Sequence, residues 1–142
     1  MTEDLKQMVV EANQALVSSG LVALTWGNVS AIDRESGLVA IKPSGVAYEE
    51  LTTTSIVVLN LENEVVEGEL RASSDTKTHL EIYRNFKEVG AVVHTHSPSA
   101  TAFSQAGKGL PCLGTTHADH FYGEVPIARA LTAEEVSSDY EH

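Results

Sequence analysis

Apolar residues recur at helical spacing at the start of the chain. They lie three or four positions apart, which places them on one side of a helix: Leu5, Met8, Val9, Ala12, Leu16 and Val17. Thr2 is a candidate N-cap, and Gly20 is a candidate stop signal. The pattern therefore predicts an amphipathic helix between Thr2 and Gly20.

Short apolar runs replace the helical spacing in the next segment. Val29–Asp33 and Leu38–Ile41 flank a polar turn and predict a β-hairpin. Ile56–Asn60 and Val65–Glu67 flank another polar turn and predict a second hairpin.

Helical spacing returns in Thr76–Asn85, where Leu80 and Tyr83 fall on one side. The apolar stretch Gly90–Val93 predicts a short buried strand. Pro98 is suited to the first turn of a helix that runs to about Ala106.

The remainder of the chain has weaker patterning. Residues 107–123 predict a loop, and Val125–Ala128 predicts a further strand. No repeat or linker divides the sequence, so we expect a single domain over residues 1–142. Helices interspersed with hairpins predict a layered α/β domain rather than a regular βαβ repeat.

Composition narrows the class of protein. The 142 residues are about one domain's worth, and 9 Lys and Arg against 20 Asp and Glu give a formal net charge of −11. This charge disfavours binding to nucleic acid or to an anionic membrane. The acidic N-terminus MTEDLKQ is unlike a signal peptide, and one cysteine cannot form an intrachain disulfide. We therefore expect a soluble cytoplasmic protein.

The segment Val92-Val93-His94-Thr95-His96 is the strongest chemical signal. On a strand, residues i and i+2 face the same side, so His94 and His96 point together. Two imidazoles in this arrangement suit a divalent metal. The alternative is a pair of hydrogen-bonded histidines at the end of a strand.

A carboxylate and two hydroxyls precede the helix predicted from Thr76. Taken alone, this stretch favours an N-cap role, and Asp75 is also a candidate metal ligand. Ser73 and Ser74 add hydroxyl donors where free N–H groups and the helix dipole attract a phosphate. The metal, phosphate and capping roles are compatible with one another.

Two more segments carry candidate ligand-binding groups. Lys42, Ser44 and Gly45 follow a predicted strand and offer a cation, a hydroxyl and a flexible backbone for an anion. Gly27 and Asn28 precede a strand, where Asn28 is able to hydrogen-bond a ligand. The alternative for both segments is an ordinary turn.

The irregular stretch 114–123 contains two histidines and an aspartate. His117 and His120 are expected to be hydrogen-bonding groups rather than metal ligands. Asp119 is a candidate general acid or base if its pKa is raised, and otherwise a surface residue of a turn.

Taken together, TWGNVS, IKPSG, SSDTKTH, VVHTHS and GTTHADHFYG resemble the L-ribulose-5-phosphate 4-epimerases of the class II aldolase/adducin family. The motifs appear in family order along the chain. The resemblance implies a three-layer α/β/α fold around a largely antiparallel sheet. It also implies a cyclic homotetramer with active sites at subunit boundaries.

The resemblance further assigns roles to the candidate residues. A divalent metal, commonly zinc, would be held by Asp75, His94 and His96. The phosphate of a sugar phosphate would be bound by the matching segments, with Lys42 nearby: Gly27, Asn28, Ser44, Gly45, Ser73 and Ser74. Asp119 matches the catalytic aspartate of the epimerases.

The implied reaction inverts C4 of L-ribulose 5-phosphate to give D-xylulose 5-phosphate. Because the C4 hydrogen is not α to the carbonyl, simple deprotonation is difficult. Cleavage of the C3–C4 bond and re-addition to the other aldehyde face avoids this difficulty. Aldolases of the fuculose-phosphate type generally carry Glu at the position of Asp75, so Asp75 and Asp119 favour the epimerase over a sugar-phosphate aldolase.

The resemblance also implies two functional residues beyond residue 142, a third metal histidine and a catalytic tyrosine. We therefore expect this chain to be the N-terminal portion of a longer protein and to be inactive alone. A short inactive paralogue and a non-catalytic interaction module like the adducin head are the alternatives. The motifs do not separate a role in arabinose breakdown from one in ascorbate breakdown.

Overall fold

A computed structural model describes residues 2–137 of the chain. These residues divide into two compact units, 2–95 (the first unit) and 96–137 (the second unit). No helix within these residues combines the length and the apolar character needed to cross a bilayer.

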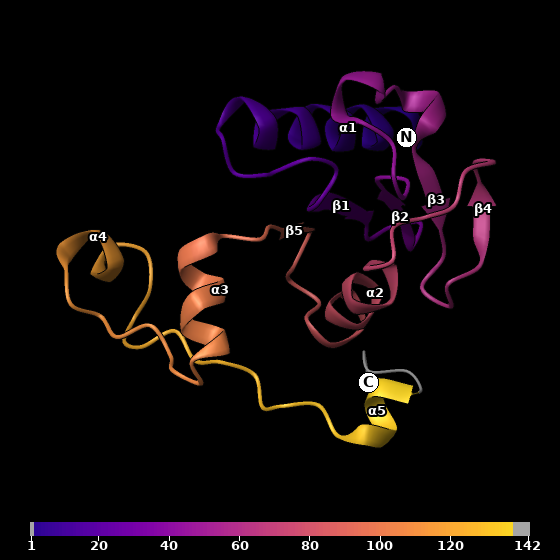
Figure 1. Cartoon of the computed structure of the whole chain (residues 1–142). Helices are drawn as coiled ribbons and strands as arrows, with labels where there is room; N and C mark the ends of the chain where they lie inside the picture. The colour runs from indigo at the N-terminus through magenta and orange to yellow at the C-terminus, as the bar shows by residue number, and fades with distance from the viewer. Residues whose placement is uncertain (1, 138–142) are drawn as a thin grey trace. The chain divides into compact units, whose positions relative to one another are not determined.

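An antiparallel sheet forms the centre of the first unit (Figure 1). Its five strands lie in the order β4-β3-β2-β1-β5. Their bounds are β1 Asn28–Asp33, β2 Leu38–Ile41, β3 Val57–Leu59, β4 Val65–Glu67 and β5 Ala91–His94. Both predicted hairpins are confirmed, because β1 pairs with β2 and β3 pairs with β4.

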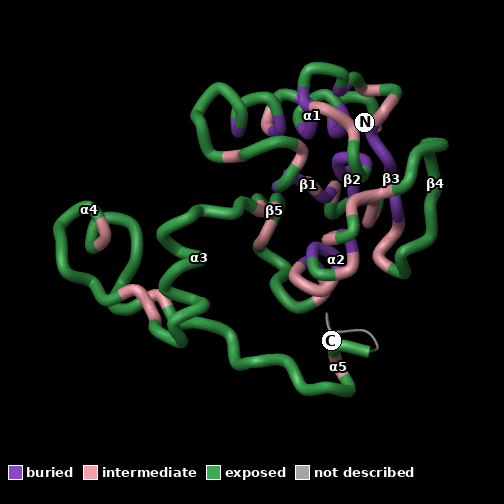
Figure 2. Tube along the Cα trace, viewed as in Figure 1, coloured by how far each residue is buried: buried purple, intermediate pink, exposed green. Residues whose placement is uncertain are grey.

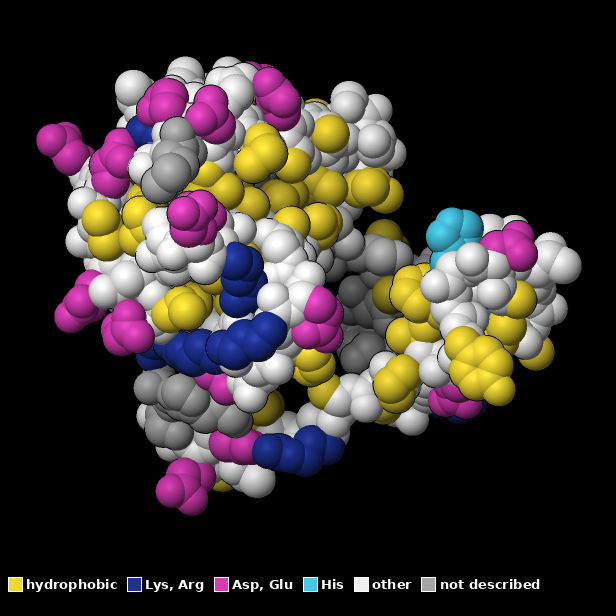
Figure 3. Space-filling model, turned by 180° about the vertical axis from the view of Figure 1, so that it is seen from behind, with side chains coloured by type: hydrophobic (Ala, Val, Ile, Leu, Met, Phe, Trp, Pro, Cys, Tyr) yellow, Lys and Arg dark blue, Asp and Glu magenta, His cyan; other side chains and the backbone are white. Residues whose placement is uncertain are grey.

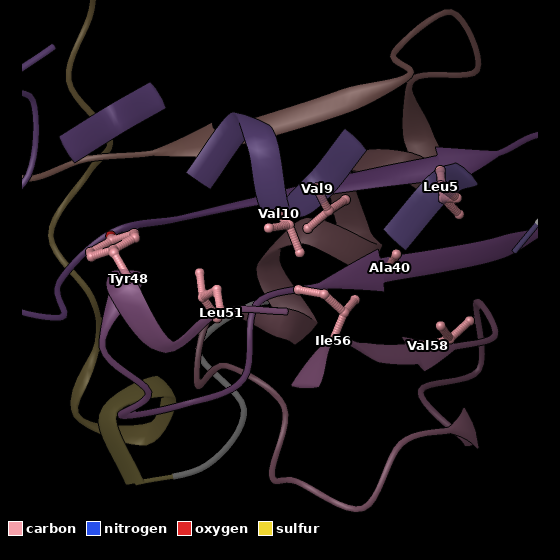
Figure 4. Close-up of a cluster of buried hydrophobic side chains, with 8 residues drawn as sticks. All are labelled: Leu5, Val9, Val10, Ala40, Tyr48, Leu51, Ile56 and Val58. Atoms are coloured by element: carbon pink, nitrogen blue, oxygen red, sulfur yellow. The ribbon is translucent and has the colours of Figure 1, made fainter. Parts of the chain in front are cut away.

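Helix α1, Thr2–Ser18, covers one face of the sheet together with two short 3₁₀ helices, η1 Tyr48–Glu50 and η2 Thr53–Ser55. Thr2 is the first described residue of α1 and lies inside the helix rather than before it. Figure 4 shows the buried cluster between these elements, which consists of Leu5, Val9, Val10, Ala40, Tyr48, Leu51, Ile56 and Val58.

Helix α2, Thr76–Asn85, covers the opposite face. Its Leu80 and Tyr83 pack against Ile32 and Val39 of the sheet. Val39 and its neighbour Ala40 belong to different clusters, as expected for side chains that alternate across a strand. The expected α/β/α layering and antiparallel sheet are therefore present in the first unit.

Arg34, the residue after β1, fastens the far end of α2. Its guanidinium donates hydrogen bonds to the carbonyl oxygens of Tyr83 at 2.9 Å, Phe86 at 2.8 Å and Val89 at 2.5 Å. Carbonyls at a helix C-terminus have no partner within the helix, so a five-donor side chain is well suited to satisfy them.

Asn13 joins α1 to β1. Its amide nitrogen donates to the carbonyls of Val9 at 2.7 Å and Val29 at 3.2 Å, and its oxygen accepts from the Val29 amide at 2.9 Å.

We expect Asn13→Ala to lower the free energy of unfolding by about 2 kcal/mol, because it leaves buried backbone groups unpaired. Urea denaturation measures this loss. Exposed Gln14→Ala on the same helix should cost less than about 0.5 kcal/mol, and equal losses would contradict the interpretation.

The second unit contains α3 Pro98–Gln105, α4 Thr115–Ala118 and α5 Ala133–Ser137. The helix predicted from Pro98 is confirmed, and the Ser97 side chain accepts a hydrogen bond from the Ala100 amide at its start. The two shorter helices were not predicted, because four or five residues carry too little periodicity.

The predicted strand Val125–Ala128 is wrong. Only Val125 pairs, in an isolated bridge with Leu110. Pro126 follows directly and lacks an N–H group, so it cannot donate to a ladder.

Burial differs between the two units (Figure 2). Every described residue that is buried belongs to the first unit. The second unit carries large apolar side chains on its surface, several of them visible in yellow at the right of Figure 3. The most exposed are Leu113, Phe121, Tyr122 and Val136.

Candidate functional site

The structure brings two of the predicted phosphate-binding loops side by side. The Ser44 amide donates to the Arg71 carbonyl at 2.9 Å, and the Ser73 amide donates to the Lys42 carbonyl at 3.2 Å. Gly45 has a φ of +72°, in the left-handed region that favours glycine. Segments nearly thirty residues apart in sequence therefore form one surface of the first unit.

Asp75 occupies the N-cap position of α2, but its side chain makes no capping hydrogen bond. Its Oδ2 instead accepts from the Asn28 amide nitrogen at 2.6 Å and from the Ser73 hydroxyl at 3.4 Å. The same amide nitrogen donates to Ser73 Oγ at 3.1 Å. The carboxylate is thus turned away from its own helix and held against β1.

His94 completes this group from the end of β5. It lies opposite Asn28 in the β1–β5 pair, and its Nδ1 is 4.0 Å from Asp75 Oδ2. Three segments that are distant in sequence therefore converge on one point: the start of β1, the start of α2 and the end of β5. We call Asn28, Asp75 and His94 the carboxylate cluster.

Gly27 permits the close approach of β1 and β5 beside this cluster. Its φ is +88°, and a Cβ there would lie 2.8 Å from the His94 carbonyl oxygen and 2.9 Å from Val22 Cγ1. Its own carbonyl accepts a hydrogen bond from the Tyr48 hydroxyl at 2.8 Å. A residue with any side chain would push the end of β5 away.

Lys42 is buried, and its ammonium group is directed to its own loop. Its Nζ donates to the Val46 carbonyl at 2.7 Å and lies 4.8 Å from the centre of the Tyr48 ring. Burial lowers the pKa of Lys42. These contacts indicate that Lys42 braces the loop that carries Ser44 and Gly45, beside its predicted role near a phosphate.

A buried polar row lies next to the carboxylate cluster, between β1 and α2. Ser30 Oγ is 2.7 Å from His79 Nδ1 and 2.7 Å from the Tyr83 hydroxyl. Sequence reasoning missed these roles, although two spacings pointed to them. Asp75, His79 and Tyr83 follow at intervals of four on one helix face, and Asn28 and Ser30 at an interval of two on one strand face.

His79 is held in its neutral form. Burial lowers its pKa to about 4, with the neighbouring Asp75 opposing the shift and His94 adding to it. Its Nε2 atom is buried and has no hydrogen-bond partner among the residues that the structure describes.

This low pKa predicts an acid-sensitive fold. Between the unfolded pKa of about 6.5 and the folded pKa of about 4, His79 is protonated in the unfolded chain but neutral in the folded one. The free energy of unfolding therefore decreases as the pH is lowered through this range, and the decrease ends below about pH 4. The full loss is about 3 kcal/mol. Urea denaturation between pH 7 and pH 4 measures it, and His79→Gln should remove this component from the pH dependence. An unchanged slope in His79→Gln would contradict the assignment.

The carboxylate cluster contains two of the three predicted metal ligands, Asp75 and His94. Two ligand atoms of a tetrahedral zinc lie about 3.3 Å apart, and the oxygen of Asp75 and the nitrogen of His94 are 4.0 Å apart. The donor types suit a divalent ion, and the two atoms lie about 0.7 Å farther apart than in a tetrahedral zinc site. Within residues 2–137, no group of three His, Cys, Asp or Glu side chains is placed to hold a metal.

Two of the predicted site residues, His96 and Asp119, lie in the second unit, whereas Ser74 lies in the first. His96 is exposed and precedes α3, and Asp119 is exposed at the C-terminal end of α4. His117 Nε2 and His120 Nδ1 are hydrogen-bonded to backbone carbonyls at 2.8 and 2.9 Å. Their predicted hydrogen-bonding role is thereby confirmed.

Residues 7–140 match the Class II Aldolase and Adducin N-terminal domain. The chain belongs to this family. The family resemblance inferred from the motifs is thus confirmed, and class II aldolases are metal-dependent enzymes acting on sugar phosphates.

Several solved structures of the class II aldolase family share the fold. An L-fuculose 1-phosphate aldolase is 34% identical with a TM-score of 0.83, and the match covers 91% of this chain. The L-fuculose-1-phosphate aldolase of Thermus thermophilus is 31% identical with a TM-score of 0.72 over 93% of this chain. That of Glaciozyma antarctica is 27% identical with a TM-score of 0.66 over 77% of it.

The chain is shorter than these class II aldolases. The matched region covers 60%, 66% and 46% of the three structures, in the same order.

Proposed function

We propose that this chain is part of a metal-dependent L-ribulose-5-phosphate 4-epimerase, which interconverts L-ribulose 5-phosphate and D-xylulose 5-phosphate by breaking and re-forming the C3–C4 bond. Zinc is the proposed metal, and a homotetramer is the proposed assembly. Family membership supports chemistry on a sugar phosphate, and the choice of reaction comes from the candidate site.

The position of the Asp75 carboxylate carries the proposal. A base that removes a proton from substrate carbon must reach into open space, whereas Asp75 Oδ2 is held by Asn28 and lies beside His94. Asp is also one methylene shorter than the Glu expected in the fuculose-phosphate aldolases. Both features favour a role in holding the metal, as in the epimerases.

The residues then divide the work as follows. Asp75, His94 and His96 are the proposed metal ligands, and the bound metal supplies Lewis-acid stabilisation of negative charge on the substrate's carbonyl oxygen. Asn28 orients the Asp75 carboxylate. Ser44, Gly45, Ser73 and Ser74 bind the phosphate through hydroxyls and backbone amides, which retains the cleaved aldehyde while it rotates. Asp119 is the proposed acid or base for the C4 hydroxyl proton.

A sugar-phosphate aldolase is the second candidate. The observation that favours it is the 34% identity and the TM-score of 0.83 to an L-fuculose 1-phosphate aldolase. The two reactions share bond cleavage and differ in whether the aldehyde leaves.

The test is a product assay on the full-length protein. L-ribulose 5-phosphate is incubated with the protein and zinc, with and without a chelator, and D-xylulose 5-phosphate is measured. We expect product only in the chelator-free sample. In parallel, L-fuculose 1-phosphate is offered and release of a free aldehyde is measured.

The outcomes separate the candidates. Aldehyde release that is faster than epimerisation would contradict the proposed epimerase function and support the aldolase function instead. No turnover of either substrate, together with no bound metal and a measured protein partner, would support a non-catalytic module instead.

A further inference from the structure

Polar residues of β1 hydrogen-bond to polar residues of α2 and its N-cap, and we call this row of contacts the ladder. On β1, Asn28 and Ser30 share the face that packs against α2. On α2 and its N-cap, Asp75, His79 and Tyr83 follow one another at one turn's distance. Asn28 meets Asp75 at 2.6 Å, while Ser30 meets both His79 and Tyr83 at 2.7 Å.

The hydrogen atoms of this ladder have a direction. When the Tyr83 hydroxyl donates to Ser30 Oγ, both hydroxyl hydrogens of the ladder find an acceptor. The Ser30 hydrogen is then available to His79 Nδ1. The opposite direction would leave a hydroxyl hydrogen unpaired on Ser30 or Tyr83, both fully buried, at a cost of about 1–3 kcal/mol.

This direction determines the form of the imidazole. A neutral histidine that accepts at Nδ1 carries its hydrogen on Nε2. The Nε2–H group of His79 is therefore a donor held in a fixed orientation, in a side chain that is 1% exposed.

Asp75 is the negatively charged group that acts on the His79 imidazole. Long helical side chains lean toward the helix N-terminus, and Asp75 is one turn away in that direction. The His79 amide donates to the Asp75 carbonyl at 3.1 Å, and the imidazole interacts electrostatically with the carboxylate. Nε2 has no partner among residues 2–137.

We propose that His79 is a positioning residue for Asp75: the chain from Tyr83 through Ser30 holds its Nε2–H as a donor to the carboxylate when Asp75 binds a metal. This inference rests on the proposed metal-side role of Asp75. Groups that hydrogen-bond to metal ligands fix the orientation of those ligands, and their loss typically weakens metal affinity about 10–100-fold.

Cobalt(II) binding to the full-length protein provides the test, followed by visible absorption without substrate. His79→Leu keeps most of the volume but removes the donor, and we expect its dissociation constant for cobalt to rise about 10–100-fold. His79→Gln retains an N–H group near the position of Nε2 and should stay within about fivefold of the wild type. Ser18→Ala, on the exposed surface of α1, is the neutral control.

The tautomer of His79 gives an independent measurement. Nitrogen-15 NMR of the metal-free protein should show the hydrogen on Nε2, and Ser30→Ala should allow both tautomers. Because this measurement uses wild-type protein, a hydrogen on Nδ1 would overturn the proposal even if His79→Leu fails to fold.

Two results would overturn the positioning role: a hydrogen on Nδ1 in the wild type, or equal cobalt affinities for His79→Leu and His79→Gln. Wild-type protein that binds no cobalt would instead overturn the proposed metal-dependent function, and the positioning role with it. Failure of the inference alone therefore leaves a wild type that binds cobalt normally.

Discussion

Replacing Asp75 with asparagine is expected to reduce kcat/KM of the full-length protein at least about 100-fold, or about 2.7 kcal/mol of transition-state stabilisation. The amide is nearly isosteric but uncharged, so it is a poor ligand for a divalent cation. It also places an NH₂ group or a neutral oxygen where Asn28 now donates to a carboxylate at 2.6 Å. Steady-state kinetics and metal content measured on the same preparation check both effects.

The matched control is Glu62→Gln, which removes a carboxylate from an exposed turn of the first unit. We expect it to leave kcat/KM and metal content unchanged. If Asp75→Asn retained activity within about threefold of the wild type, the proposed metal-side role of Asp75 would be wrong.

Replacing Gly27 with alanine is expected to lower the free energy of unfolding by about 4 kcal/mol. The left-handed backbone costs about 1–2 kcal/mol for a residue with a Cβ, and forced overpacking adds about 1–3 kcal/mol. The contacts responsible are the His94 carbonyl oxygen at 2.8 Å and Val22 Cγ1 at 2.9 Å. Chemical denaturation measures the loss.

Gly37→Ala separates the two contributions. Gly37 has a φ of +73°, but a Cβ there would meet nothing within 4 Å. It should therefore show the backbone cost of about 1–2 kcal/mol alone. Similar losses in both variants would mean that β1 and β5 can separate at Gly27 without penalty. Because His94 lies at this contact, Gly27→Ala should also weaken metal binding.

The elements of the first unit could be predicted because each has a clear period and clear boundaries. The helix Thr76–Asn85 and the hairpin strands Leu38–Ile41 and Val65–Glu67 have the bounds that the apolar pattern predicted. The strand expected at Val125–Ala128 did not form, since a short apolar run carries no information about a pairing partner.

The candidate site was predicted as a set of residues but not as a geometry. Sequence alone left open whether Asp75 caps its helix, and that choice depends on Asn28, which is nearly fifty residues away. Lys42 was expected near a phosphate, and sequence alone did not show that its ammonium also donates to the Val46 carbonyl of its own loop. The role of Ser30 depends on the register between a strand and a helix, which no local pattern encodes.

Helix α2 contacts both ends of β1, so its length must match the distance between these two contacts. Asn28, at the start of β1, holds Asp75, and Arg34, just after its end, holds the carbonyls of Tyr83 and Phe86. One residue added to the helix would advance one end by about 1.5 Å and rotate it by about 100° relative to the other. Both sets of contacts could not then be satisfied together. The number of residues between Asp75 and Tyr83 therefore sets the position of the carboxylate as strictly as the identity of its direct neighbours does.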